Sequence, residues 1–203
     1  MLLEAELFVM TEEMLVEVLG RIRVDDREIV LPVMVGMPGT DPTTPMWEAV
    51  EQNAEDDAGV PDALNGRSRD AVDDHRSGRE LLGDDPMGQL TLLADAAKEA
   101  ARAAVDGDAP VPSPFGDVPT RDYLLQLTLA RCLLAHYVAA YLGSTACPLP
   151  EELARPLWEL TEPDADTWRS RGFFRDPMPL PDHVSWRDRF LLSAGHQPHP
   201  LGH

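Results

Sequence analysis

The stretch that decides the fold is YLLQLTLARCLLAHYVAAYLG, residues Tyr123–Gly143. Its apolar residues fall on every side of a helix, which is typical of a helix surrounded by other elements. The polar residues within it, including an arginine, make it too polar to cross a bilayer. Thr120 is expected as the N-cap, Asp122 as a first-turn acid and Gly143 as the left-handed end. We therefore predict a central helix over residues 120–142 in a soluble all-α bundle.

One stripe of this helix carries the polar side chains that could perform chemistry. Thr128, Cys132 and His136 follow one another at intervals of four residues, so they share a face, with Arg131 and Tyr137 beside it. In a buried helix, the polar side chains of such a stripe either form hydrogen bonds with other groups of the protein or point toward a bound ligand.

Composition narrows the classes of function. The 203 residues include 17 basic and 36 acidic side chains, a net charge of −19. This balance argues against nucleic acid and anionic membrane partners, which need basic patches. Two cysteines and no basic leader before an apolar core predict a cytoplasmic protein without a disulfide framework. The scarcity of lysine suggests a high-GC bacterial source.

Apolar periodicity predicts three more long helices, over residues 2–22, 46–57 and 86–105. In the first, Leu3, Leu7, Met10, Met14 and Val18 are expected to face inward, with the glutamates, including Glu12, off that line. Thr43–Pro45 is expected to open the second helix, and Asp85 with Pro86 the third.

The connecting segments are expected to be mostly irregular. Residues Ile29–Val35 are predicted as an extended connection without a partner strand, because Pro32 interrupts them. An acidic loop is expected within residues 51–85. Seven prolines between Pro148 and Pro181 leave room only for short helices, near 151–160 and 185–193. We predict a bundle over 1–143 and an extension over 144–203 packed on it, with a loose tail.

Several phrases carry a family resemblance: LLGDDPMGQL, PFGDVPTRDYLLQLT, AAYLG and RGFFRDPMPLPDHVSWRDRFLLSAGHQP. In this order they resemble the DinB/YfiT-like superfamily, in the actinobacterial branch around mycothiol-dependent maleylpyruvate isomerases. The resemblance covers nearly the whole chain and implies a four-helix bundle.

The resemblance also implies a divalent metal held by a histidine of the second helix and a pair of residues four apart on the fourth. The second-helix histidine falls at Asn53. The fourth-helix histidine falls at Leu134, paired with Ala130, or at His136, paired with Cys132, depending on the register. Asn53 damages the site in either register, so we predict no metal cofactor; zinc or nickel would require a rebuilt Cys132–His136 site.

Each candidate residue also has a structural interpretation. Cys132 and His136 could form a metal or thiolate–imidazole pair, or be ordinary buried residues. Arg131 could clamp a substrate anion, or pair with Glu55, Asp56 or Asp57 of the second helix. Tyr137 and Tyr141 could be core aromatics, or Tyr137 could donate a hydrogen bond to an enolate oxygen. The histidines His75, His196, His199 and His203 are expected in solvated segments, and the pattern around His183 indicates nothing.

Three functions remain open. The first is a metal-independent isomerase or cyclase, in secondary metabolism, acting on a hydrophobic carbonyl compound through His136, Tyr137 and Arg131. The pocket that binds its substrate would be lined by Trp47, Asn53, Asp57 and Cys132. The second is a thiol transferase or isomerase with a Cys132–His136 metal site, and the third is a non-catalytic binding protein. The assembly stays open between a monomer and a homodimer.

Overall fold

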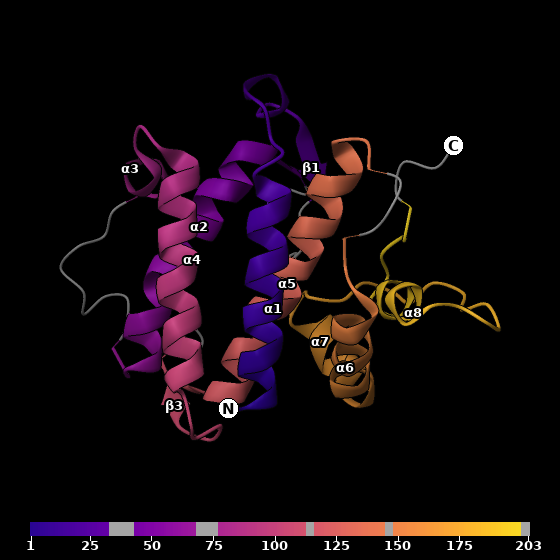
Figure 1. Ribbon diagram of the computed structural model, residues 1–203. Coiled ribbons are helices and arrows are strands. Elements are labelled where there is room, and N and C mark those ends of the chain that lie inside the picture. Colours follow the sequence, from indigo (N-terminus) through magenta and orange to yellow (C-terminus); the bar gives the residue numbers. More distant parts are fainter. Residues whose placement is uncertain (33–42, 68–76, 113–115, 145–147, 200–203) are drawn as a thin grey trace.

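The computed structural model describes residues 1–32, 43–67, 77–112, 116–144 and 148–199. The fold is all-α, as predicted, with two small two-stranded sheets. Four long helices form its main part (Figure 1). They are α1 (Leu3–Leu19), α2 (Met46–Leu64), α4 (Pro86–Ala103) and α5 (Thr120–Tyr141). The shorter helices are α3 (Gly78–Leu82), α6 (Glu151–Thr161), α7 (Ala165–Ser170) and α8 (Trp186–Ser193), with 3-10 turns at Val24–Asp26 and Glu162–Asp164.

The four predicted long helices are therefore confirmed, with one difference in length. Helix α2 continues to Leu64, past the predicted end at residue 57 and past Pro61. Proline lacks an N–H and usually ends a helix, which is why the sequence suggested an earlier stop. Here the added turns bury Val60 in an apolar cluster with Ala5 and Phe8 of α1.

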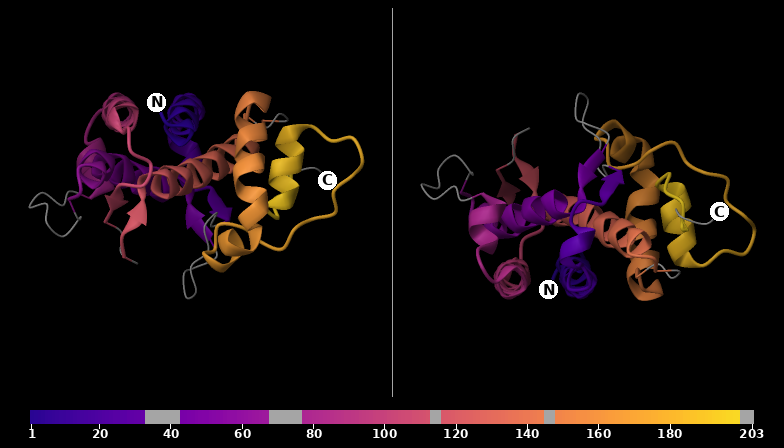
Figure 2. Two further views of the ribbon diagram at one scale, coloured as in Figure 1. Left: turned by 90° about the horizontal axis from the view of Figure 1, so that it is seen from below. Right: turned by 90° about the horizontal axis from the view of Figure 1, so that it is seen from above.

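Helix α5 is the most enclosed element, also as predicted. Residues 131–140 are all buried, so the helix is covered on every side over this length. It packs against α1, while α4 packs against both α1 and α2. Seen along α1 and α4, it crosses the group obliquely (Figure 2). It is the one described helix long and apolar enough to span a membrane, but 78% of the tested window is buried inside the protein. This burial is typical of the core helix of a soluble protein.

The ends of α5 confirm one expectation and correct another. Gly143 has φ +85° and follows the last turn, as a left-handed helix end requires. The N-cap is Pro119, however, and Thr120 is the first helical residue. The Thr120 hydroxyl instead donates to the Ala109 carbonyl, 3.0 Å away. This bond ties the helix start to the hairpin formed by β3 (Pro110–Val111) and β4 (Val118–Pro119).

The segment around Pro32 also differs from the expectation. Strand β1 (Val30–Pro32) pairs antiparallel with β2 (Thr43–Pro45), so it does have a partner strand. Thr43–Pro45 accordingly forms a strand, and no side chain caps α2. The two strands are only three residues long, too short for composition alone to indicate them. Residues 33–35 of the predicted connection lie outside the described residues.

The residues that α1 buries differ in part from the predicted inward line, and the difference affects the site. Leu3 is exposed and Met10 and Met14 are half-buried, although all three were expected inside. Leu7 and Val18 of the predicted line are buried as expected, and a second line, Phe8, Glu12, Leu15 and Leu19, is buried as well. This line has helical spacing too, but it contains a glutamate, whose burial requires a compensating partner.

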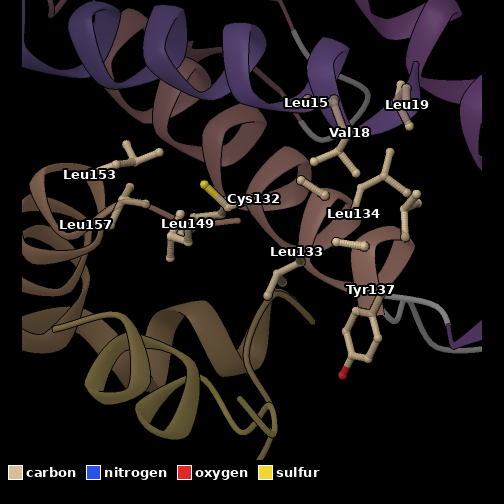
Figure 3. Close-up of a cluster of buried hydrophobic side chains, with 14 of the residues drawn as sticks. Leu15, Val18, Leu19, Cys132, Leu133, Leu134, Tyr137, Leu149, Leu153 and Leu157 are labelled. Atoms are coloured by element: carbon tan, nitrogen blue, oxygen red, sulfur yellow. The ribbon is translucent and has the colours of Figure 1, made fainter. Parts of the chain in front are cut away.

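The two short C-terminal helices are confirmed and are joined by a charged contact. Both oxygens of the Glu151 carboxylate, at the start of α6, accept backbone N–H groups at the start of α8, including Trp186 N at 2.8 Å. An anion at a helix N-terminus satisfies N–H groups that have no partner within the helix. Side chains of α1 and α6 reach different sides of α5 (Figure 3). The α6 helix also packs against α1.

Candidate functional site

Arg131 lies at the centre of a buried group of charges. Its guanidinium forms ion pairs with Glu12 of α1 and with Asp57 of α2. The three side chains are each 2% exposed or less. Asn53 Nδ2 donates to the second oxygen of Asp57 at 3.0 Å, and the Phe8 ring faces the guanidinium, with its centroid 5.2 Å from Cζ. We call Glu12, Asp57 and Arg131 the ion triad.

The prediction that Arg131 pairs with an acid of the second helix is confirmed at Asp57. Of the other two candidates, Glu55 accepts from Gly78 N at 2.7 Å and Asp56 from the Gln52 amide at 3.3 Å. Sequence reasoning missed Glu12. One signal in the sequence could have indicated that Glu12 is buried. Glu12 lies at helical spacing from the apolar residues Phe8, Leu15 and Leu19, and a buried Arg131 requires an acid on a neighbouring helix.

The triad holds two carboxylates for one permanent cation, so one negative charge is in excess. Burial raises the pKa of Glu12 to about 8; the charge of Arg131 lowers it and that of Asp57 raises it. Although burial disfavours its charged form, Asp57 and then Glu12 hold the pKa of Arg131 above its ordinary value. A neutral Glu12 beside an Arg131–Asp57 pair leaves no net charge in the core.

A second polar group forms where the C-terminal segment lies on α5. The Nε2 atom of His136 is 2.9 Å from the Gln197 carbonyl oxygen, and the Tyr137 hydroxyl is 2.9 Å from Nδ1 of His196. The rings of His136 and His196 both meet that of Tyr137 edge to face. We call His136, Tyr137 and His196 the imidazole cluster. The expectation that His196 is solvated is wrong, because its side chain is fully buried.

The tautomer of His136 follows from its partner. A carbonyl oxygen can only accept, so Nε2 carries the proton and donates to Gln197. Burial lowers the pKa of His136, partly opposed by this hydrogen bond, so the imidazole is neutral at pH 7. Its Nδ1 atom is then an acceptor. It is buried and has no hydrogen-bond partner among the described residues.

The pKa values of the other two cluster members are shifted in the directions that favour their neutral forms. Burial lowers the pKa of His196 to about 3, and the charges of Arg175 and His136 act in the same direction, opposed by a backbone hydrogen bond at Phe173. Burial likewise raises the pKa of Tyr137. The cluster is therefore an uncharged set of donors and acceptors at neutral pH.

The remaining predicted site residues lie elsewhere. Cys132 is buried, with Sγ 3.5 Å from the Thr11 hydroxyl of α1. Trp47 is half-buried, and the Arg27 guanidinium lies over its indole ring. The Arg27 Cζ atom is 3.8 Å from the centroid of that ring. The structure thus joins Asn53 and Asp57 to Arg131, and His136 to Tyr137. It gives Cys132 and Trp47 separate partners, so the predicted residues do not line one shared site.

The donors of a family-type metal site do not fit a metal in this arrangement. The Asn53 amide bonds Asp57, whose carboxylate holds a guanidinium, and His136 Nε2 donates a proton to a carbonyl. Across the described parts of the chain, no three His, Cys, Asp or Glu residues are grouped as metal ligands. Cys147 lies outside the described residues.

Comparison of the chain with models of known protein families, with curated proteins and with solved structures finds no match. The DinB/YfiT resemblance therefore stays a prediction from the quoted phrases.

Proposed function

We propose that this chain is a metal-independent enzyme of the isomerase or cyclase type, on a DinB/YfiT-like bundle. Its substrate is a hydrophobic carbonyl compound, and His136 is its acid–base residue. One observation carries the proposal. His136 is a buried, neutral imidazole whose Nδ1 has no hydrogen-bond partner in the described part of the chain, beside a hydrogen-bonded Tyr137–His196 pair. A buried acceptor without a partner is costly in a purely structural role.

The proposed chemistry uses the tautomer described above. The Nε2–H group donates to the substrate's carbonyl oxygen, and this bond strengthens as that oxygen gains negative charge while the neighbouring C–H proton passes to a solvent water, from which a proton is later returned to carbon. A neutral imidazole is suited to this task because it keeps both a donor and an acceptor at pH 7. Tyr137 is the second donor, once its hydroxyl turns from His196 toward the substrate.

Arg131 is reassigned from anion clamp to structural residue. Two carboxylates already hold its guanidinium in the core. A substrate carboxylate that replaced Asp57 would leave the Asp57 carboxylate buried without a cation, and one added beside Asp57 would leave an excess negative charge in the core.

A second candidate, a non-catalytic binding protein, is favoured by a different observation. All three members of the imidazole cluster are buried, and His136 and Tyr137 of α5 bond Gln197 and His196 of the chain's own C-terminal segment, so the cluster could serve only to hold that segment. The thiol-transferase alternative receives no such support, because Cys132 Sγ and His136 Nε2 take different partners.

Proton exchange in D₂O separates these functions without knowledge of the natural substrate. NMR would follow loss of the protons next to the carbonyl in a panel of apolar ketones. The proposal expects catalysed exchange that is lost in His136→Gln and kept in the control His183→Gln, which changes an exposed loop residue. Exchange equal in both variants would refute His136 as the acid–base residue. A ligand retained in native mass spectrometry, with no exchange, would favour the binding protein.

A further inference from the structure

The contact between Gln197 and His136 has the form expected of a bound carbonyl substrate. A peptide carbonyl oxygen accepts from Nε2 of the buried His136 at 2.9 Å in a partly buried contact. We propose that this oxygen occupies the docking position of the substrate's carbonyl, and that the segment Gly195–His199 must leave α5 for a substrate to bind. This inference rests on the proposed function and specifies how its site is opened.

The segment is held mainly by a few polar contacts. His196 N donates to the Leu191 carbonyl at 2.8 Å, and the His196 ring bonds Tyr137. Gln197 and His199, by contrast, are exposed. Local opening of a segment that buries little apolar surface requires much less free energy than global unfolding. The segment can therefore compete with a ligand without being a permanent part of the core.

The titratable groups around the imidazole cluster come from α5, the C-terminal segment and the residues before α8. His199 acts on the pKa of His136, Arg175 and Tyr141 act on that of Tyr137, and Arg175 acts on that of His196. Described acids are absent from the set that shifts the pKa of either histidine. Because the Nε2–H group of His136 already donates to a peptide carbonyl, the site suits a carbonyl acceptor such as that of a ketone or amide.

Gly195 offers a means of moving the segment without changing a cluster residue. It has φ +78°, and a Cβ atom there would lie 2.6 Å from both Arg175 Cβ and the Asp176 carbonyl oxygen. Gly195→Ala should therefore displace the segment. Gly66→Ala is a matched control, because Gly66 has φ +74° but an added Cβ would meet nothing within 4 Å.

The test labels the full-length chain with diethyl pyrocarbonate, which acylates accessible neutral imidazoles, and measures modified His136 by mass spectrometry. We expect labelling of His136 about tenfold faster in Gly195→Ala than in wild type, and an unchanged rate in Gly66→Ala. Exposed His183 serves as the internal reference for reagent activity. Tyr137→Phe, which removes the bond to His196, is the second variant if Gly195→Ala does not fold.

Cyclohexanone tests the carbonyl half of the inference, with cyclohexene at the same concentration as the control. We expect the ketone, and not the hydrocarbon, to slow labelling of His136 in Gly195→Ala. Equal labelling of wild type and both opened variants, or equal protection by the two compounds, would overturn the inference. Labelling does not depend on turnover, so this test can succeed even if the proton-exchange test of the proposed function fails. The two failures can therefore be told apart.

Discussion

Glu12→Gln is the substitution that most sharply tests the excess carboxylate in the core. Glutamine has the shape of a protonated glutamate, so the variant keeps the Arg131–Asp57 pair and removes only the capacity to ionise. The pKa of Glu12 is raised from 4.5 to about 8 in the folded protein, chiefly by burial. A raised carboxyl pKa contributes stability that is fully present below pH 4.5 and is lost as the pH rises through 8.

The size of the effect follows from the same shift. One pKa unit corresponds to about 1.4 kcal/mol, so ionisation of Glu12 in the folded state costs up to roughly 5 kcal/mol at alkaline pH. This is a large share of the typical stability of a domain, about 5–15 kcal/mol. Wild type and Glu12→Gln should have similar free energies of unfolding near pH 5. The variant should become more stable than wild type by several kcal/mol at pH 9.

Urea unfolding of both proteins at a series of pH values from 5 to 9 measures this difference, because most other titrations cancel between them. Glu13→Gln is the control, since Glu13 is the neighbouring residue with a largely exposed carboxylate. A difference that does not change with pH would refute the raised pKa. A variant that becomes less stable than wild type as the pH rises would show that Glu12 is ionised and stabilises the core.

Three further predictions concern the other polar groups. Arg131→Met should lower the free energy of unfolding by roughly 3–5 kcal/mol, because it strands the buried Asp57 carboxylate; a loss below about 1 kcal/mol in urea unfolding would place Arg131 outside the core. Protein purified without added metal should contain no stoichiometric zinc or nickel in an emission-spectrometry assay. Stoichiometric metal lost in Cys132→Ala would favour the thiol transferase. His196→Leu should destabilise the protein more than His196→Asn, whose side-chain oxygen can still accept from Tyr137, by about 1 kcal/mol in thermal melts; equal losses would contradict the Tyr137–His196 hydrogen bond.

The sequence was sufficient for the long helices because apolar periodicity and helix-end residues agree there. Asp85 accepts from Gly88 N and Pro86 begins α4, as the local pattern predicted. It was insufficient for α3, whose five residues depend on a capping box of Ser77 and Glu80 inside an acidic stretch. The capping box is a local signal that the acidic composition of the stretch obscured.

The candidate site was predictable in part. The all-round burial of α5 indicated that Arg131 needed an acid, and the family resemblance placed it beside α2, which gave Glu55, Asp56 and Asp57 as candidates; Asp57 is the partner. Glu12 was missed because two alternative apolar lines on α1 have helical spacing, and choosing between them requires the packing against α5. His196 was missed because no local pattern indicates that a proline-flanked tail returns to the central helix. Both are long-range contacts, which single-sequence patterns do not encode.

The most direct test of the account is the protonation of His136, followed by nitrogen-15 NMR as the pH is lowered. The account predicts a neutral ring with its proton on Nε2 at pH 7, a pKa below the ordinary 6.5, and a shift of the Nε2 signal when cyclohexanone is added to Gly195→Ala. A ring that titrates at its ordinary pKa, or that carries its proton on Nδ1, would contradict the proposed role of His136 toward a carbonyl.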